Sequence, residues 1–342
     1  MVRIIENFFT PGDFAKREKE VLEKVLKKTG FKVQRELFRG VIYDKHKLGS
    51  VILLGSWHGN PAVLKLQGLK IEVDEVATLK KFTTQNTNPR VRVPEVYVYE
   101  PWQAERGYGY HIMEYINAKP IFDMPWPSRQ DLQRFAQFYE EYRKTISAPW
   151  IAMPLQNIIT FGTERLERWR AIRESKEGND VKEYSEQLVR FMRLAPRAYL
   201  NSSLVFCHGH LTANDVYPVG QQFVLMSNVY WTWRTPLYDS VFSIWGCLIR
   251  MSNQGDSGDK AFSLIRNWFE LYRQYSPHFV ATPNLERTFW IALLERIMGV
   301  LLADLALHDK FKTEDGKMRR AKLLEVNQDL FERVALQVER TL

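Results

Sequence analysis

The stretch that decides the fold is Val205-Phe-Cys-His-Gly-His-Leu-Thr-Ala-Asn-Asp-Val-Tyr217. It holds the strongest local pattern in the chain, two histidines (His208 and His210) followed by the pair Asn214-Asp215. Apolar runs around it predict short strands over residues 204–206, 215–218 and 222–227. The polar residues therefore belong to a small β-rich island.

A second motif follows that island. Leu225-Met-Ser-Asn228 is followed by Pro236-Leu-Tyr-Asp239, and 12 positions separate Ser227 from Asp239 (239 − 227). The same region is rich in aromatic residues, which indicate either a binding face or, more simply, core packing. These residues are Tyr230, Trp231, Trp233 and Trp245.

Periodicity divides the remaining chain into two parts. In the first part, apolar spacing predicts helices over residues 13–29 and 70–82. Strands are predicted there over residues 33–38, 41–43, 50–57, 62–66, 93–99 and 110–115. From about residue 131 helical spacing dominates, over residues 131–146, 163–174, 181–193, 260–275, 285–307 and 317–342.

The first motif resembles the catalytic loop of the aminoglycoside phosphotransferase and choline kinase-like families. Their pattern is H-G-D-L-x-x-x-N followed by two apolar residues, and His208, Gly209 and Leu211 match it. His210 stands where these families have the catalytic aspartate, and Asp215 stands where they have an asparagine. The resemblance implies a structural role for His208, which braces the loop through hydrogen bonds.

The second motif is similar to the metal-binding loop of the same families. Its proline, its tyrosine and the distance to Asp239 are kept, but Ser227 replaces the aspartate that binds the metal. By the resemblance, Asp239 caps or braces the loop. Because two motifs keep their spacing, coincidence is a poor explanation.

The strand Ala62-Val-Leu-Lys-Leu66 resembles the family's strand whose lysine contacts the ATP phosphates. This assigns that role to Lys65. Glu75, ten residues further on, falls on the predicted helix that carries the ion-pair partner of this lysine. Glu72 competes with Glu75 for that place.

Two further segments match the nucleotide-binding parts of the family. Gly49 and Ser50 open a predicted strand where the family has its glycine-rich phosphate loop, although Gly-Ser before a strand is also an ordinary turn. The segment 111–116 resembles the hinge whose backbone binds adenine. Met113, Glu114 and Tyr115 are therefore expected to contact the nucleotide.

The resemblance covers about residues 30–245 and implies an α+β fold of the bilobal, protein-kinase-like type. We expect residues 1–115 to form an N-terminal lobe with a leading helix, a five-stranded antiparallel sheet and one further helix. Residues 116–342 should form a larger, mainly helical lobe. That lobe would carry the catalytic-loop-like motif 205–217 and the metal-loop-like motif 225–239.

The substitutions alter the chemistry that these families perform. Phosphoryl transfer uses a lysine on the phosphates, bridging Mg²⁺ and a carboxylate that orients and deprotonates the acceptor hydroxyl. This chain supplies His210, Asp215 and Ser227 at the three loop positions, so two carboxylates become one. Mg²⁺ prefers carboxylate oxygens, which leaves Asp215, Asn214 and, weakly, Ser227 as metal ligands. Loss of a general base costs ~10²–10⁴ in rate.

The residues therefore favour a pseudokinase, a degenerate member of this family with a nucleotide-binding type of cleft and little or no phosphotransfer. The alternative is an active ATP- and Mg²⁺-dependent phosphotransferase of a small hydroxylated substrate, with Asp215 as principal metal ligand. A scaffold that binds no nucleotide is a third hypothesis. His208, His210 and Asp215 also suggest a transition-metal site, but no clear further ligand accompanies them.

The amino-acid composition favours some classes of binding partner and disfavours others. A net charge of +8 without long basic blocks favours anionic small molecules such as ATP, disfavours nucleic acid and disfavours polycationic aminoglycosides. Two cysteines cannot form a disulfide framework, and no apolar run reaches the ~18 residues of a membrane span. The expectation is a cytoplasmic protein with a nucleotide and an unnamed small molecule or protein as partners.

Overall fold

The structure is a computed structural model that describes residues 12–40, 50–68, 73–122, 127–177, 184–252, 258–305 and 314–342. Its contacts divide the chain into two units, each of which is described by itself. The first unit contains Met1–Thr84, Arg92–Ala118 and Val224–Val229. The second contains Gln85–Val91, Lys119–Phe223 and Tyr230–Leu342.

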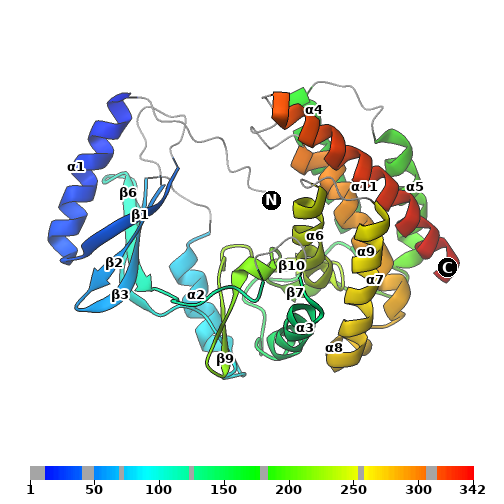
Figure 1. The fold of residues 1–342 in the computed structure, drawn as a ribbon, viewed down its shortest axis with the longest axis horizontal. Helices are drawn as coiled ribbons and strands as arrows, with labels where there is room; N and C mark the ends of the chain where they lie inside the picture. Colours follow the sequence, from blue (N-terminus) through cyan, green and yellow to red (C-terminus); the bar gives the residue numbers. More distant parts are fainter. Residues whose placement is uncertain are drawn as a thin grey trace. The chain divides into compact units, whose positions relative to one another are not determined.

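An antiparallel sheet in the order β1-β2-β3-β6-β5 forms the centre of the first unit (Figure 1). The strands are β1 (Lys32–Gly40), β2 (Ser50–Trp57), β3 (Asn60–Gln67), β5 (Val96–Gln103) and β6 (Tyr108–Glu114). The antiparallel sheet predicted from the sequence is confirmed. The predicted strand over residues 41–43 lies outside the described residues.

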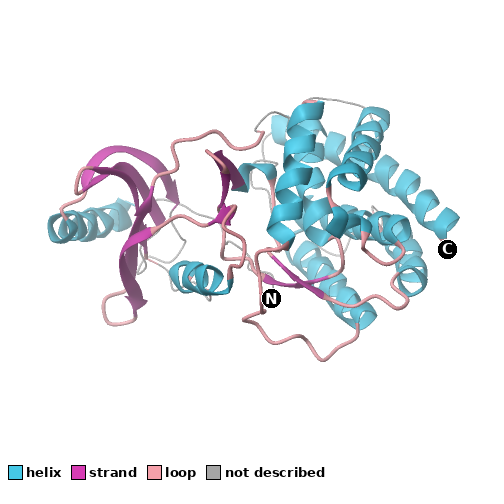
Figure 2. Ribbon diagram, turned by 90° about the horizontal axis from the view of Figure 1, so that it is seen from below, coloured by secondary structure: helices cyan, strands magenta, loops and turns pink. Residues whose placement is uncertain are grey.

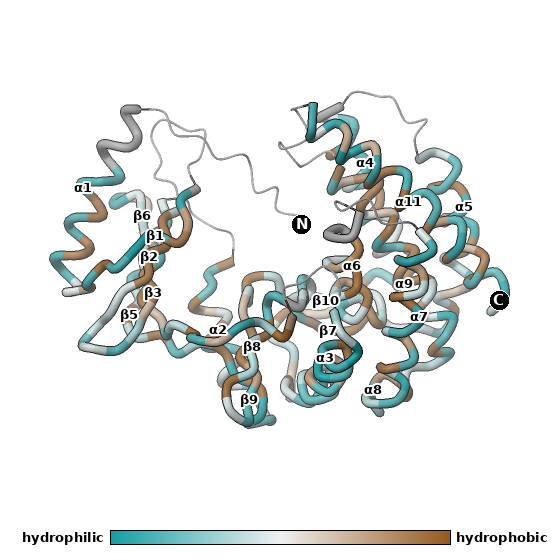
Figure 3. Tube along the Cα trace, viewed as in Figure 1, coloured by the Kyte–Doolittle hydropathy of each residue, from teal (hydrophilic) through white to brown (hydrophobic). Residues whose placement is uncertain are grey.

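Alternation along β3 explains how the sheet acquires a core face. Ala62, Leu64 and Leu66 are fully buried, as expected when every second side chain of a strand points to the same face. The helix α1 (Gly12–Thr29) packs Val21 and Val25 against this hydrophobic cluster. Hydrophobic residues, brown in Figure 3, recur along β2 and β3 for this reason. The helix α2 (Glu75–Gln85) completes the unit.

The second unit is mainly helical (Figure 2). Its helices are α3 (Arg129–Arg143), α4 (Ile158–Glu177), α5 (Ser185–Ala198), α6 (Tyr238–Ser252), α7 (Gly258–Tyr275), α8 (Pro277–Val280), α9 (Leu285–Gly299) and α11 (Glu314–Thr341). A π-helical turn, η2 (Val300–Asp304), continues α9. The helix predicted over residues 285–307 is therefore divided into an α-helical and a π-helical part.

Short strands and one 3₁₀ turn form the island that the sequence indicated. β7 (Val205–Cys207) pairs with β10 (Thr232–Arg234) in antiparallel fashion. The strands β4 (Val91–Arg92), β9 (Gln222–Leu225) and β8 (Val216–Val219) form a sheet in that order. The turn η1 (Ala213–Asp215) lies between β7 and β8 along the chain. We call residues 208–215 the 208–215 loop.

The helix α9 lies in the core of the second unit. Every side chain from Thr288 to Glu295 is buried, and so is Arg296. Glu295 forms an ion pair with Arg165, and Arg296 forms one with Asp304. A helix surrounded on all sides needs such partners for each of its charges.

Some element boundaries differ from the prediction. The helix predicted over residues 70–82 begins at Glu75 and extends to Gln85, with residues 69–72 outside the description. The helix α6 was not predicted. No helix within the described residues has the length and hydropathy needed to cross a bilayer.

Candidate functional site

Lys65 and Glu75 form an ion pair in the first unit. Lys65 lies on β3, and its Nζ is 2.5 Å from Oε2 of Glu75, the first residue of α2. Both side chains are largely buried, with 20% and 12% of their surface exposed. The pair therefore holds the lysine charge in one position. Glu72, the competing partner, lies outside the described residues.

His111 lies beside this ion pair. It stands opposite Lys65 in the register of β3 and β6, and its Nε2 is 3.8 Å from Oε2 of Glu75. Burial lowers the pKa of His111 to about 4, against the opposing influence of Glu75. Burial would raise the pKa of Glu75, but the nearby charge of Lys65 opposes burial and the pKa is lowered. At neutral pH the cluster thus contains an ammonium, a carboxylate and a neutral imidazole.

Asp74 fixes the start of α2 and so the position of Glu75. Its Oδ1 accepts a hydrogen bond from the N–H of Ala77 at 3.1 Å. Its Oδ2 accepts one from the hydroxyl of Tyr99 on β5. A side-chain oxygen that accepts from the first helical N–H groups is the usual N-terminal cap of a helix.

In the hinge-like segment at the end of β6, several hydrogen-bonding groups already have partners in the first unit. The carboxylate of Glu114 forms a two-point ion pair with Arg92, at 2.5 and 2.8 Å. The N–H of Glu114 donates to the carbonyl of Glu95 at 2.8 Å, and the N–H of Tyr115 to that of Pro61 at 3.4 Å. A ligand would therefore have to use other groups here, such as carbonyl oxygens, which accept more than one hydrogen bond.

The remaining residues assigned to nucleotide binding are Gly49, Ser50 and Met113, and they differ in whether they are described and accessible. Gly49 lies outside the described residues. Ser50 begins β2 and pairs with Gly40 on one side and Gln67 on the other. Met113 is buried in the sheet, with 7% of its surface exposed. Of these three, only Ser50 is described and partly accessible.

In the second unit, the carboxylate of Asp239 supports the 208–215 loop from α6. Its Oδ2 accepts the N–H of His208 at 3.0 Å, and its Oδ1 accepts the N–H of Gly209 at 2.9 Å. The hydroxyl of Tyr142 on α3 donates to the same carboxylate at 2.5 Å. His208 and Asp239 are both buried. These bonds fix the backbone at the start of the loop.

The backbone of the loop requires a glycine at position 209. Its φ is +78°, in the left-handed region that side chains disfavour. A Cβ atom there would lie 2.6 Å from the carbonyl oxygen of Tyr230 and 2.9 Å from Cγ2 of Thr232. The loop therefore passes closely against β10 and the residues before it.

His210, at the position of the catalytic aspartate, lies between two aromatic rings. Its ring stacks on Tyr230 with centroids 4.5 Å apart, and it contacts Phe242 at 4.7 Å. Its Nδ1 is 4.0 Å from Oδ2 of Asp215. Burial lowers the pKa of His210, while Asp215 acts in the opposite direction. An imidazole carries no negative charge in either of its two protonation states, so none stands at this position.

Asp215 is largely buried and takes part in the turn that contains it. Its Oδ2 accepts hydrogen bonds from the N–H of Thr212 at 2.9 Å and from the hydroxyl of Thr212 at 2.6 Å. This capping arrangement begins η1. The neighbouring Asn214 is exposed. One oxygen of the only carboxylate in the loop is thus used to hold the loop together.

Ser227 has an unusual backbone conformation. Its φ is +58°, which is uncommon for a residue with a side chain. The buried Asn228 follows, and its Nδ2 donates to the carbonyl of Leu225 at 2.7 Å. The turn after β9 is thus sharply defined, and strained residues of this kind are found at functional sites as well as in turns.

No protein-family model and no curated protein matches the sequence, but solved structures match the fold. Amicoumacin kinase hAmiN, solved with AMP-PNP and Ca²⁺, aligns over 93% of this chain and 96% of its own with a TM-score of 0.59 and 12% identity. Choline kinase from Cryptosporidium parvum Iowa II aligns over 94% and 99%, with a TM-score of 0.57 and 14% identity. Spectinomycin phosphotransferase, solved with ADP and spectinomycin, aligns over 94% and 98%, with a TM-score of 0.50 and 12% identity.

The chain has a kinase-like phosphotransferase fold. The α+β, protein-kinase-like fold class expected from the two motifs is confirmed. At 12–14% identity the likeness concerns the fold alone.

The residues assigned to a nucleotide and those assigned to a metal differ in the contacts that they make. The Lys65–Glu75 pair is formed. The donors assigned to a metal contain a single carboxylate, Asp215, and one of its oxygens is occupied by Thr212. Across the described ranges, no three His, Cys, Asp or Glu side chains are grouped so as to hold a metal. The donor set does not fit Mg²⁺ well.

Sequence reasoning missed three residues that shape the site. Tyr142 supports Asp239, Thr212 engages Asp215, and His111 borders the Lys65–Glu75 pair. Only Thr212 had a local signal, because a threonine three residues before an acidic residue is a capping pattern. The other two contacts join residues far apart in the sequence.

Proposed function

We propose that this protein is a pseudokinase with the phosphotransferase fold, which binds a nucleotide such as ATP and transfers phosphate little or not at all. One observation carries the proposal. The Lys65–Glu75 ion pair is formed at 2.5 Å, whereas the position of the general base holds His210, a ring packed between Tyr230 and Phe242. The chain thus keeps the charge that holds phosphates and lacks the carboxylate that activates the acceptor.

Each feature supports one half of this proposal. The ammonium group of a lysine on a strand, held in place by a carboxylate from a helix, favours binding of phosphate oxygens. An imidazole cannot supply the negative charge or geometry of an aspartate. Loss of the base costs ~10²–10⁴ in rate, or about 3–5 kcal/mol of barrier. The missing metal-binding carboxylate at Ser227 adds to this loss.

Calorimetric titration with ATP tests the binding half. Lys65→Met should weaken ATP binding at least tenfold, because a charge-assisted contact to phosphate is worth about 1.5–3 kcal/mol. The matched control is Lys81→Met, an exposed lysine on α2, which should bind ATP like the wild type. If the wild type gives no heat at millimolar ATP, the nucleotide-binding proposal fails and a scaffold remains.

An active ATP- and Mg²⁺-dependent phosphotransferase is the second candidate, and Asp215 is the observation in its favour. This carboxylate is present at 4.0 Å from Nδ1 of His210, so a base and an acid group are adjacent. In that case steady ATP consumption with a hydroxylated acceptor would be abolished by Asp215→Asn. Absence of turnover in the wild type, with ATP bound, supports the pseudokinase.

A further inference from the structure

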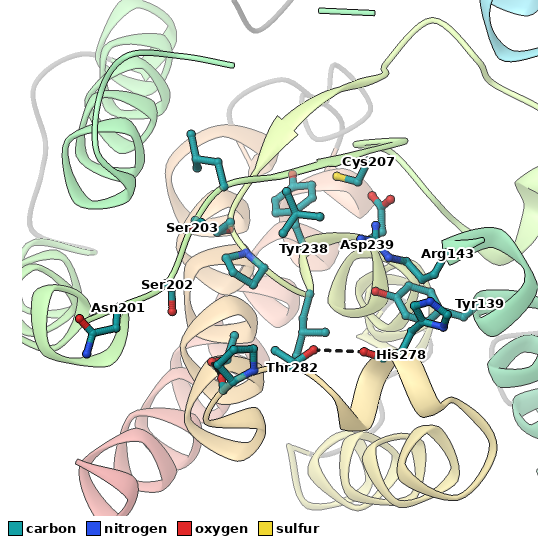
Figure 4. Close-up of a pocket in the computed structure, with 17 residues that line it drawn as sticks. Tyr139, Arg143, Asn201, Ser202, Ser203, Cys207, Tyr238, Asp239, His278 and Thr282 are labelled. Atoms are coloured by element: carbon teal, nitrogen blue, oxygen red, sulfur yellow. Dashed lines mark hydrogen bonds between the residues drawn. The ribbon is translucent and has the colours of Figure 1, made fainter. Parts of the chain in front are cut away.

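A cavity of about 290 Å³ lies within the second unit, next to the residues that support the 208–215 loop (Figure 4). Cys207 and Asp239 line it, together with Tyr139 and Arg143 of α3. Its volume is close to the lower end of the range for small-molecule sites, about 300–1,000 Å³. None of the residues matched to the nucleotide-binding motifs lines it.

Arg143, the last residue of α3, places a partly buried cation in this cavity without a counter-ion. In the described part of the chain it has no ion-pair partner and no hydrogen-bond partner. Burial would lower the pKa of its guanidinium, but the surrounding tyrosines, Cys207 and Asp239 raise it. An arginine offers five N–H donors in a fixed plane, and a carboxylate satisfies two of them at once.

Asp239 does not fill that role, although it lines the same cavity. Its oxygens accept the N–H groups of His208 and Gly209 and the hydroxyl of Tyr142. It is not within ion-pair distance of Arg143, 4.0 Å. The guanidinium is therefore available to a second, external anion.

Polar groups are also available on the opposite side. Figure 4 shows Ser202 and Ser203 across the cavity from Arg143. Neither hydroxyl has a hydrogen-bond partner among the described residues, whereas the hydroxyl of Thr235 donates to Glu295 at 2.8 Å. Apolar side chains, such as Leu237, lie in the wall between these ends.

We propose that this cavity is a binding site for a small organic carboxylate with a polar group at its far end. The carboxylate would accept two hydrogen bonds from Arg143, and the far group would bond to Ser202 and Ser203. The inference does not rest on the proposed nucleotide binding.

The charged residues of the cavity favour a ligand with one negative charge over a ligand with two. Arg143 is its only arginine or lysine among the described lining residues, and the Asp239 carboxylate stands nearby. The ring of His278 is already bonded to Glu140, with Nδ1 and Oε1 2.7 Å apart. A phosphate dianion would therefore meet one cation and an aspartate, whereas a carboxylate matches the single guanidinium.

Titration with 4-hydroxybenzoate, followed by calorimetry on the full chain, tests the proposal. Saturable one-to-one binding is expected for the wild type, and 4-hydroxybenzyl alcohol, which lacks the charge, should bind at least tenfold more weakly. Arg143→Met should cause a similar loss, and Ser202→Ala a smaller one. Arg134→Met removes an exposed arginine from the same helix and should leave binding unchanged.

Three results would overturn the proposal. The first is the absence of saturable binding at tens of millimolar probe. The second is equal binding by Arg143→Met, with folding checked by circular dichroism, or equal loss in Arg134→Met. The third is tighter binding of inorganic phosphate than of the carboxylate at equal ionic strength. If Arg143→Met does not fold, loss of binding in Ser202→Ala supports the site and unchanged binding contradicts it.

Discussion

Asp239 holds the start of the 208–215 loop from α6, and Ser243 of the same helix donates to the carbonyl of Leu211 at 2.8 Å. Asp239 is buried, and its carboxylate accepts two backbone N–H groups and the hydroxyl of Tyr142. Hydrogen bonds to a charged acceptor are about twice as strong as neutral ones. An asparagine at this place would turn an amide N–H₂ group toward at least one of these donors.

Asp239→Asn should therefore lower the free energy of unfolding by about 2–4 kcal/mol. Urea denaturation followed by tryptophan fluorescence measures this. Asp259→Asn is the control, because Asp259 is an exposed partner of Arg333 on the surface and should contribute less than about 1 kcal/mol. Equal losses in the two variants would show that Asp239 does not support the loop.

His111 should make the stability depend on pH. Its pKa is about 4 in the folded protein and 6.5 without these surroundings, so the unfolded chain takes up the proton first as the pH falls. The stability from its neutral form is complete above pH 6.5 and is lost between pH 6.5 and 4. At pH 5 the loss should be about 2 kcal/mol.

Denaturation at pH 7.5 and pH 5 checks this difference. His111→Gln should reduce it by about 2 kcal/mol and leave only the part that comes from His210, whose pKa is also lowered, whereas His58→Gln, at an exposed turn, should keep it whole. The comparison stops at pH 5 because Glu75, whose pKa is lowered, loses its contribution only as the pH falls below the unfolded value of 4.5. A difference that is unchanged in His111→Gln would assign the effect to another group.

The conformation of the 208–215 loop, as an element, requires a glycine at position 209 for two reasons that can be tested separately. Gly209 has a positive φ and no room for a Cβ atom, whereas Gly220, in the turn between β8 and β9, has a positive φ and open space. Alanine at Gly220 should cost about 1 kcal/mol for conformation alone. Alanine at Gly209 should cost about 1–3 kcal/mol more because of the contact with Tyr230. Similar costs for the two variants, measured by denaturation, would contradict the close packing of the loop.

The elements also show where sequence periodicity is informative. The predicted strand over residues 50–57 matches β2, and the predicted helix over residues 260–275 differs from α7 by two residues at its start. The helix α7 has one buried and one exposed side, which produces a helical period, and β2 begins with partly exposed and buried side chains in alternation. The helix α6 contains Asp239 and Trp245, which the sequence patterns indicate as parts of a motif and of an aromatic cluster and not as parts of a helix. It was missed for that reason.

The candidate site was predictable to a different extent. Lys65 and Glu75 lie ten residues apart, and the resemblance of their strand and helix to those of the phosphotransferase families paired them, with Glu72 as the competing partner. Tyr142 lies 97 residues from Asp239, and only the folded chain brings these two together. Local motifs therefore identified the positions where charge had changed, while the hydrogen bonds that support those positions required the structure.

For the molecule as a whole, the proposed function predicts how strongly Mg²⁺ affects the affinity for ATP. A chain that supplies few metal ligands should bind ATP through Lys65 and gain little from Mg²⁺. An active enzyme should bind ATP with Mg²⁺ much more tightly than without it, since carboxylates hold the ion that bridges the phosphates.

The double variant His210→Asp with Ser227→Asp restores both missing carboxylates and should acquire this dependence. Thermal unfolding with ATP, in Mg²⁺ or in EDTA, reports it, because a bound ligand stabilises the folded state in proportion to its affinity. We expect similar stabilisation of the wild type in both conditions. In the double variant, Mg²⁺ should tighten ATP binding about tenfold, or about 1.4 kcal/mol. The same two replacements at His58 and Ser147, which are exposed, should have no such effect. Strong Mg²⁺ dependence in the wild type would instead favour an active phosphotransferase with Asp215 as its metal ligand.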